Sequence, residues 1–145
     1  MIEVAWIGRA GIGTPMKRIT RTVELDAVRD LLERPPRATL AFTRDGRIDA
    51  HPVSFVYRSG SYFFGMQAGP GADAIESAAH ARLLIDEGCY HTELRGLWLL
   101  GKPVPADPAH EGGSDSLRWF ELQVERTSAW DYDLMREMAE DDGPR

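Results

Sequence analysis

Features that the chain lacks exclude several classes of protein. Its single cysteine, Cys89, cannot form a disulfide within the chain. With no disulfide framework and no secretory pattern, the sequence predicts a protein of the reducing cytoplasm. The N-terminal apolar run is too short for a signal peptide or a membrane span, and Glu3 interrupts it. We therefore expect no interaction with a membrane.

Positive charge is also scarce. The 145-residue chain carries a formal net charge of −6 and has a pI near 5.2. A protein that binds nucleic acid needs a basic face to neutralise phosphates, so this balance argues against DNA or RNA as a partner. Lys17 and Lys102 are the only lysines. Any anion site is therefore expected to be built from arginine.

The motifs of several enzyme classes are missing as well. The glycines between Gly8 and Gly13 do not form GxGxxG, and the chain has no P-loop, HExxH or GxSxG. Cys89 and His91 alone are more typical of a loop than of a metal site. No ligand spacing relates the four histidines, His51, His80, His91 and His110. The sequence predicts neither a metal site nor a dinucleotide fold.

The strongest positive signal is a run of strands between residues 38 and 67. Three consecutive antiparallel strands are predicted at 38–43, 47–57 and 62–66. Asp45-Gly46 and Ser59-Gly60 mark the two turns, because glycine accepts a positive φ. A small-residue loop at 67–71 then leads into a short helix.

The second of these strands contains a change of phase. Ile48 and Ala50 share one face, whereas Val53, Phe55 and Tyr57 are shifted by one residue. A strand with period two changes phase through a bulge, so we predict a bulge at His51-Pro52. Two interpretations stay open: the bulge directs backbone groups at a ligand, or it only turns a barrel corner.

Further elements flank these strands. A helix is predicted from Leu25, with Asp26 as its N-cap and Pro35-Pro36 as its end, and a second helix begins with Asp73 as its N-cap. The remaining predictions are strands at 82–86, 92–100 and 117–126, a surface loop at 102–114, and a helix after Trp130 with Leu134, Met135 and Met138 on its apolar side.

Six strands and short helices in this order predict an α+β fold that is mainly β, an antiparallel barrel. We divide the chain into an N-terminal arm at 1–24, a barrel domain at 25–130, and a C-terminal helix with an acidic tail at 131–145. Trp119 falls on the charged face of its strand, so we expect it to cover a partner surface.

From about Leu25 to Trp130, this layout resembles the pyridoxamine 5′-phosphate oxidase-like family of FMN-binding split barrels. The resemblance implies a six-stranded antiparallel split β-barrel with short flanking helices. It also implies a homodimer whose cofactor lies in a groove between the subunits. The residues it assigns to the cofactor are His51, Pro52, Val53 and Ser54 at the isoalloxazine edge, Phe64, Gly65, Met66 and Gln67 at the ribityl and phosphate side, and Trp98, Trp119 and Trp130 as closure from the second subunit.

One segment departs from that family. Its FMN-binding members commonly carry a lysine or arginine just after the third strand, to hold the phosphate. Here residues 68–73 contain no base, and Asp73 would repel a phosphate. Arg44, Arg47 and Arg82 are candidate substitutes, because arginine can pair bidentately with phosphate. Each of them also fits an exposed turn residue that binds nothing.

The resemblance implies an oxidoreductase for a small molecule, dependent on FMN or on a deazaflavin in the same groove. The flavin would carry the redox chemistry. No catalytic residue is evident, and His51 is the best candidate for acid–base work. The alternative, favoured by the missing base, is a non-enzymatic binding or stress-related barrel that has lost its cofactor. Haem is a third hypothesis, with His51, His80 or His91 as axial ligand.

Overall fold

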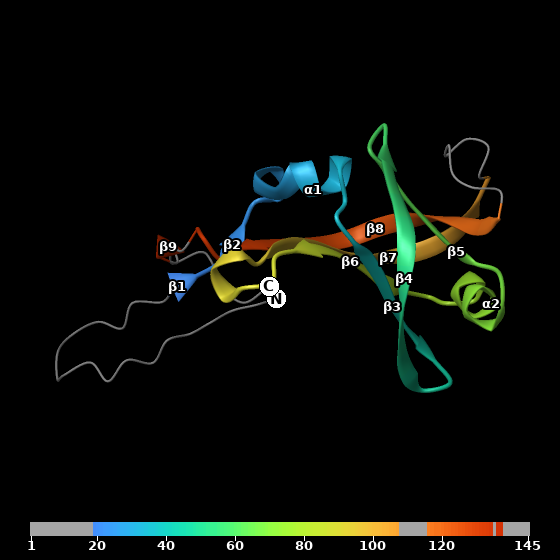
Figure 1. The fold of residues 1–145 in the computed structure, drawn as a ribbon. Helices are drawn as coiled ribbons and strands as arrows, with labels where there is room; N and C mark the ends of the chain where they lie inside the picture. The colour runs from blue at the N-terminus through green and yellow to red at the C-terminus, as the bar shows by residue number, and fades with distance from the viewer. Residues whose placement is uncertain (1–18, 108–115, 135, 138–145) are drawn as a thin grey trace.

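The computed structural model of the chain describes residues 19–107, 116–134 and 136–137 (Figure 1). Its elements are short except for three long strands. They are, in order, β1 (Ile19–Thr20), β2 (Thr22–Val23), the 3₁₀ helix η1 (Leu25–Val28), α1 (Arg29–Glu33), β3 (Ala38–Arg44), β4 (Arg47–Arg58), β5 (Ser61–Gln67), α2 (Pro70–Glu76), β6 (Ala81–Glu87), the 3₁₀ helix η2 (His91–Glu93), β7 (Arg95–Ala106), β8 (Leu117–Asp131) and β9 (Arg136–Glu137).

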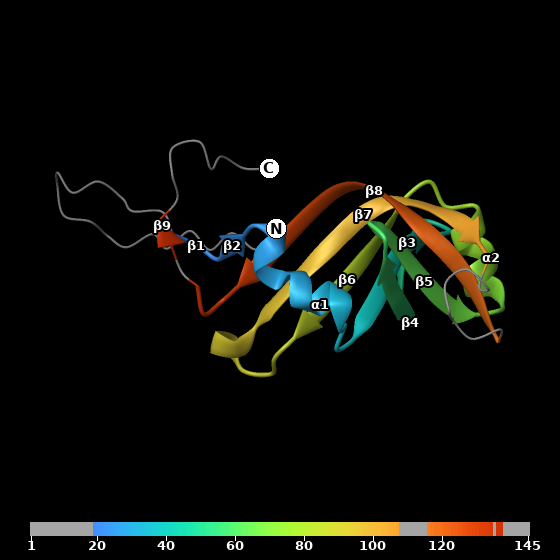
Figure 2. The same ribbon diagram turned by 90° about the horizontal axis from the view of Figure 1, so that it is seen from above.

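Six antiparallel strands close into a barrel. They follow the order β8-β5-β4-β3-β6-β7, and β7 pairs again with β8. The strand β2 adds to β8 at Trp130, and β1 pairs with β9 away from the barrel. Helices α1 and α2 lie on opposite sides of the barrel (Figures 1 and 2). The predicted α+β, mainly β, six-stranded barrel with short helices is confirmed.

Both predicted hairpin turns have the expected backbone. Asp45 and Gly46 adopt φ of 50° and 73°, and Ser59 and Gly60 adopt 50° and 79°. Two consecutive residues of positive φ are the geometry of a two-residue turn whose twist matches that of the flanking strands. The local sequence therefore determines how β3, β4 and β5 pair.

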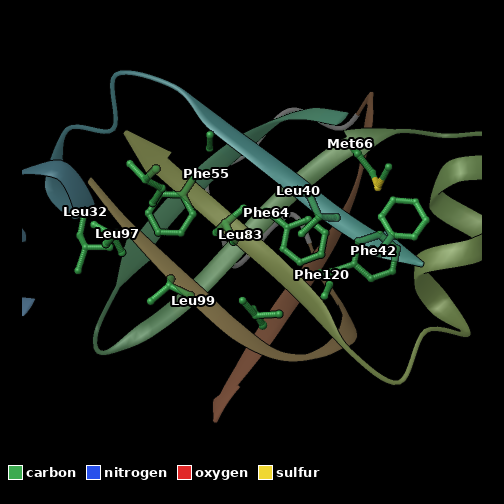
Figure 3. Packing of buried hydrophobic residues seen from close by; sticks show 14 of the residues in the cluster. Leu32, Leu40, Phe42, Phe55, Phe64, Met66, Leu83, Leu97, Leu99 and Phe120 are labelled. Atoms are coloured by element: carbon green, nitrogen blue, oxygen red, sulfur yellow. The ribbon is translucent and has the colours of Figure 1, made fainter. Parts of the chain in front are cut away.

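The core fills the inside of the barrel from end to end. Leu32, Phe55 and Leu97 meet near α1, whereas Phe42, Met66 and Phe120 meet beside α2 (Figure 3). Apart from Leu32 of α1, these residues come from alternate positions of their strands, because successive side chains of a strand point to opposite faces. A side chain's position along a strand therefore decides whether it belongs to the core or to the outer surface.

The predicted bulge at His51-Pro52 is wrong. The β3–β4 pairing runs without interruption from Ala38↔Val53 to Arg44↔Arg47. Ile48 and Ala50 simply point outward, and Ile48 is 84% exposed. The pattern implies a phase change only if these apolar side chains face the core, and they do not.

The register shift lies instead between β7 and β8, at Leu100/Gly101. Leu100 is opposite Arg126 and Gly101 is opposite Val124, so β8 carries one extra residue. The inward side chains Phe120 and Leu122 are consequently out of phase with Ala129, which is also buried in the core. Such a bulge bends a long strand and lets the sheet close.

Two predicted helix caps are also wrong. Asp26 lies inside η1, and the residue at the cap position, Glu24, makes no side-chain hydrogen bond there. The helix α2 begins at Pro70, which places Asp73 within its first turn. Proline at the first helical position lacks only an N–H that would have no helical partner. The Gly69-Pro70 pair therefore starts the helix four residues earlier than predicted.

The C-terminal third is more extended than the sequence suggested. The strand β7 continues to Ala106, into the predicted loop at 102–114, and β8 continues to Asp131. Arg136 and Glu137 form β9 rather than part of a helix. Residues 1–18 of the arm predicted at 1–24, the segment 108–115 and the tail positions 135 and 138–145 lie outside the described residues.

Candidate ligand-binding face of the barrel

The predicted cofactor residues of β4 and β5 divide between two faces. His51, Val53, Phe64 and Met66 point into the barrel, where Phe64 and Met66 belong to the core. The alternate positions face outward, namely Pro52, Ser54, Gly65 and Gln67. One ligand on one face of the sheet therefore cannot contact the side chains of both groups.

His51 occupies the end of the barrel beside α2. Its ring stacks on Phe42, with ring centroids 5.7 Å apart, and its Nε2 is buried without a hydrogen-bond partner among the described residues. That nitrogen lies 3.6 Å from the point where a Cβ on Gly71 would sit, and 3.8 Å from Oδ2 of Asp49. The imidazole is therefore directed at α2, away from the outer surface.

Short side chains form a continuous surface on the outside of β3, β4 and β6. We call it the outer strip. Thr39 pairs with Pro52 and Leu84, and Ala41 pairs with Ala50, so these residues lie side by side. The outer strip consists of Thr39, Ala41, Ala50, Pro52, Ser54 and Leu84. Because five of the six side chains are small or short, a flat ring can approach the sheet closely there.

Trp119 is covered by the chain itself, although the sequence predicts an exposed ring that covers a partner surface. It lies on the outer face of β8 opposite Gly65, and only 4% of its surface is exposed. A Cβ on Gly65 would stand 2.8 Å from the Trp119 ring. The indole therefore packs on the bare backbone of β5. The signal that could have revealed this was the glycine in the middle of a strand.

Trp98 on β7 and Trp130 on β8 lie near the C-terminal end of β8. Trp98 pairs with Leu84 and with Ser128, and Trp130 packs on Gly96. Trp119 and Trp130 are eleven positions apart, about 35 Å along the strand at about 3.3 Å per residue. Within this chain the three tryptophans therefore cannot enclose one ring, and Trp98 is the one beside the outer strip.

Arg82 is the predicted arginine that lies on this face. Its side chain crosses the Trp98 ring, with Cζ 4.2 Å from the ring centroid, and it forms no ion pair within the part of the chain that is described. By contrast, Arg44 lies 3.7 Å from Asp49 at the β3–β4 hairpin. Arg44 and Arg47 share a surface depression there with two aspartates, Asp45 and Asp49, which balance their charge.

Sequence reasoning missed one arginine beside the start of α2. Arg118 on β8 pairs with Met66, and its guanidinium donates to Asp73 Oδ1 and Glu76 Oε2, each at 2.6 Å. These hydrogen bonds, first that to Asp73, raise the pKa of Arg118 above its ordinary value. A base does therefore lie near the β5–α2 turn, but two carboxylates already hold it. Only the long-range β5–β8 pairing brings it there.

Other kinds of site receive no support from the described residues. No three side chains of histidine, cysteine, aspartate or glutamate gather there in a way that would hold a metal ion. Nor does any helix in that part of the chain have the length and apolar character needed to cross a membrane.

Comparison with known proteins finds likeness in structure only. No protein-family model and no curated protein matches the sequence. A FAD-binding protein from Mesorhizobium loti superposes with a TM-score of 0.64 at 13% identity, over 83% of this chain and 99% of that one. The FAD and haem binding protein from Mycobacterium smegmatis superposes with a TM-score of 0.64 at 18% identity, over 85% of this chain and 78% of that one. A proposed pyridoxamine 5′-phosphate oxidase from Listeria innocua superposes with a TM-score of 0.58 at 12% identity, over 72% of this chain and 95% of that one.

The barrel topology and these superpositions define the class of fold. The chain has the split-barrel fold of pyridoxamine 5′-phosphate oxidase-like proteins, as the sequence resemblance implied. Proteins named for binding flavin are among those that share it. At these identities the likeness concerns the fold, so function has to be argued from the outer strip itself.

Proposed function

We propose that this protein is a homodimeric flavin-binding oxidoreductase for a small molecule, with the isoalloxazine ring lying on the outer strip. The observation that carries the proposal is the row of short side chains across β4, β3 and β6. A planar ring needs a flat, largely apolar surface with few protruding groups. Trp98, 8% exposed, borders this surface.

The phosphate end of the flavin would be held by Arg82. This guanidinium lies on the edge of the outer strip, is exposed, and has no acidic partner among the described residues. Its planar array of donors suits a phosphate. Arg118 is less suited, because Asp73 and Glu76 occupy its donors.

When bound, the flavin would supply hydride and electron transfer. The residues of the chain would bind the ring, orient it and exclude water from one of its faces. Ser54 is the outer-strip hydroxyl of β4 and would offer a hydrogen bond to the ring edge. His51 points into the barrel, so proton transfer to a substrate on the outer strip would fall to the substrate, the flavin or solvent.

Ala50→Trp should weaken flavin binding at least about tenfold, because a large side chain would lift the ring off the sheet. Ala50 is exposed and outward, so the barrel core is not altered. Equilibrium dialysis with FMN, FAD and a deazaflavin, followed by absorbance, measures the effect. Gln123→Trp, on an exposed position of β8 outside the outer strip, is the matched control. Wild-type protein that retains none of the three flavins contradicts the proposal.

Arg82→Gln should weaken FMN about tenfold and leave riboflavin nearly unchanged, because riboflavin lacks the phosphate. The ratio of the two dissociation constants isolates the phosphate contact from any change in ring binding. Arg34→Gln removes an exposed arginine that also has no ion pair among the described residues, and should change neither constant. An equal loss of affinity for FMN and riboflavin would mean that Arg82 acts on ring binding, through its contact with Trp98, and not on the phosphate.

The dimer is expected to form through the same face. Ile48 is 84% exposed beside Ala50, and an apolar surface of this kind typically marks an interaction site. Ile48→Asp should shift the mass in solution from two chains towards one, because the charge would be buried at the interface. Light scattering measures the change. A wild-type mass near 16.2 kDa would contradict the dimer.

One observation favours a second candidate, the barrel that binds without a flavin. The base nearest the β5–α2 turn, Arg118, is neutralised by Asp73 and Glu76, so no cation is available at that turn among the described residues. On this hypothesis the outer strip serves only the dimer. Protein purified without a flavin band, unable to take one up and still dimeric, would favour it.

A further inference from the structure

A concave site lies at the other end of the barrel from α2. A cavity of about 290 Å³ opens between the β2–η1 segment and the strands β7 and β8. Its walls mix apolar and polar groups from three parts of the chain. The lining residues are Thr22, Val23, Glu24, Leu25, Trp98 and Arg126–Ala129.

The two charged residues of this cavity have opposite signs and do not pair. Glu24 precedes η1 and Arg126 follows the bulge in β8, and both are exposed. Neither forms an ion pair with any described residue, the other included. Two other arginines do have close carboxylate partners, namely Arg95 with Asp30 at 2.7 Å and Arg118 with Asp73 at 2.6 Å.

The rest of the lining is suited to a compact organic molecule. Val23, Leu25 and Trp98 form an apolar and aromatic wall, and the Ser128 hydroxyl can donate or accept a hydrogen bond. A purely anionic ligand would be repelled by Glu24, and a purely cationic one by Arg126. A ligand that carries both charges satisfies both side chains at once.

We propose that this cavity binds a small zwitterion with an apolar body, the chemical class of the α-amino acids with aromatic or aliphatic side chains. Its carboxylate accepts from Arg126, its ammonium donates to Glu24, and its side chain packs on Val23, Leu25 and Trp98. The site shares Trp98 with the border of the outer strip but does not depend on flavin binding.

Calorimetric titration of the full chain with three related compounds tests this assignment. L-Phenylalanine carries both charges, 2-phenylethylamine lacks the carboxylate, and 3-phenylpropionate lacks the ammonium. Phenylalanine should bind at least about tenfold more tightly than either analogue, because each analogue loses a hydrogen bond between charged groups. Failure of phenylalanine to bind at about 10 mM, or equal affinity for all three compounds, overturns the proposal.

Two variants connect each half of the ligand to its partner. Arg126→Gln should abolish the preference for phenylalanine over phenylethylamine while keeping that over phenylpropionate. Glu24→Gln should abolish the preference for phenylalanine over phenylpropionate while keeping that over phenylethylamine. Arg34→Gln, at an exposed arginine outside the cavity, should change neither ratio. Variants that lower all three affinities equally, with folding intact by circular dichroism, would overturn the assignment of charges.

Discussion

Gly101→Ala is expected to lower the free energy of unfolding by about 3 kcal/mol. Gly101 stands at the register shift between β7 and β8. A Cβ there would overlap the carbonyl oxygen of Gln123 and stand 2.9 Å from Cα of Val124. Because the obstacle is backbone and not the end of a side chain, relief requires the strands to separate. Urea denaturation monitored by tryptophan fluorescence measures the loss.

Gly46→Ala is the control for this effect. Gly46 adopts φ of +73°, and nothing lies within 4 Å of an added Cβ. Its substitution should cost about 1 kcal/mol, because alanine tolerates a left-handed backbone poorly but meets no clash. Equal losses for the two variants would mean that backbone conformation, and not the close approach of β7 and β8, makes Gly101 necessary.

Arg95→Met should lower the free energy of unfolding by about 2 kcal/mol. The Arg95 guanidinium donates to both carboxylate oxygens of Asp30, at 2.7 and 2.8 Å, to Glu87 at 3.0 Å and to the carbonyl of Ala27. It thus connects η1 and α1 to β6 and β7, and only 23% of its side chain is exposed. Removing the guanidinium leaves those carboxylates without their common partner, whereas methionine keeps most of the apolar stem.

Arg29→Met provides the comparison. Arg29 reaches Asp26 and Glu33 only at 3.9 and 3.5 Å, and all three side chains are more than half exposed. Such pairs typically contribute under about 1 kcal/mol. If both variants lose the same stability, the Arg95 cluster behaves as an ordinary surface ion pair.

The Arg95 cluster should also affect how stability depends on pH. Hydrogen bonds from Arg95 hold the pKa of Asp30 below its ordinary value. A carboxyl whose pKa is lowered in the folded state stabilises the fold at pH values above its unfolded pKa, which is about 3.9. This stabilisation is lost as the pH falls through the folded pKa. Below about pH 4, wild-type protein should therefore lose stability more steeply than Arg95→Met, and the two curves should converge. A constant difference at all pH values would contradict this linkage.

Local signals predicted the parts of the fold that depend on local geometry. Asp45-Gly46 and Ser59-Gly60 indicated the β3–β4–β5 hairpins because a positive φ is a property of the turn itself. The same reasoning failed for Ile48 and Ala50, since period two says which side chains share a face but not which face is buried. It failed again at α2, where Asp73 fitted a cap but Pro70 starts the helix.

The candidate site depended on contacts that no local signal encodes. The sequence placed Arg82 and Trp98 among the candidates, but their contact requires the pairing of β6 with β7. Arg118 was missed because it reaches Asp73 across a separation of 45 residues. Trp119 is predicted to cover a partner because it falls on the charged face of its strand. The glycine that receives its ring, Gly65, lies on another strand.

The position of β8 has a consequence for how the chain folds during synthesis. Within the barrel, β8 is the last strand in the sequence, yet it fills the place between β5 and β7. Until residues 117–131 leave the ribosome, two strand edges stay open, and open edges favour aggregation. The pairing that closes the barrel also spans long sequence separations, which slows folding. Expression should therefore be most sensitive to changes in β8, and chains truncated before Leu117 should aggregate instead of forming a smaller barrel.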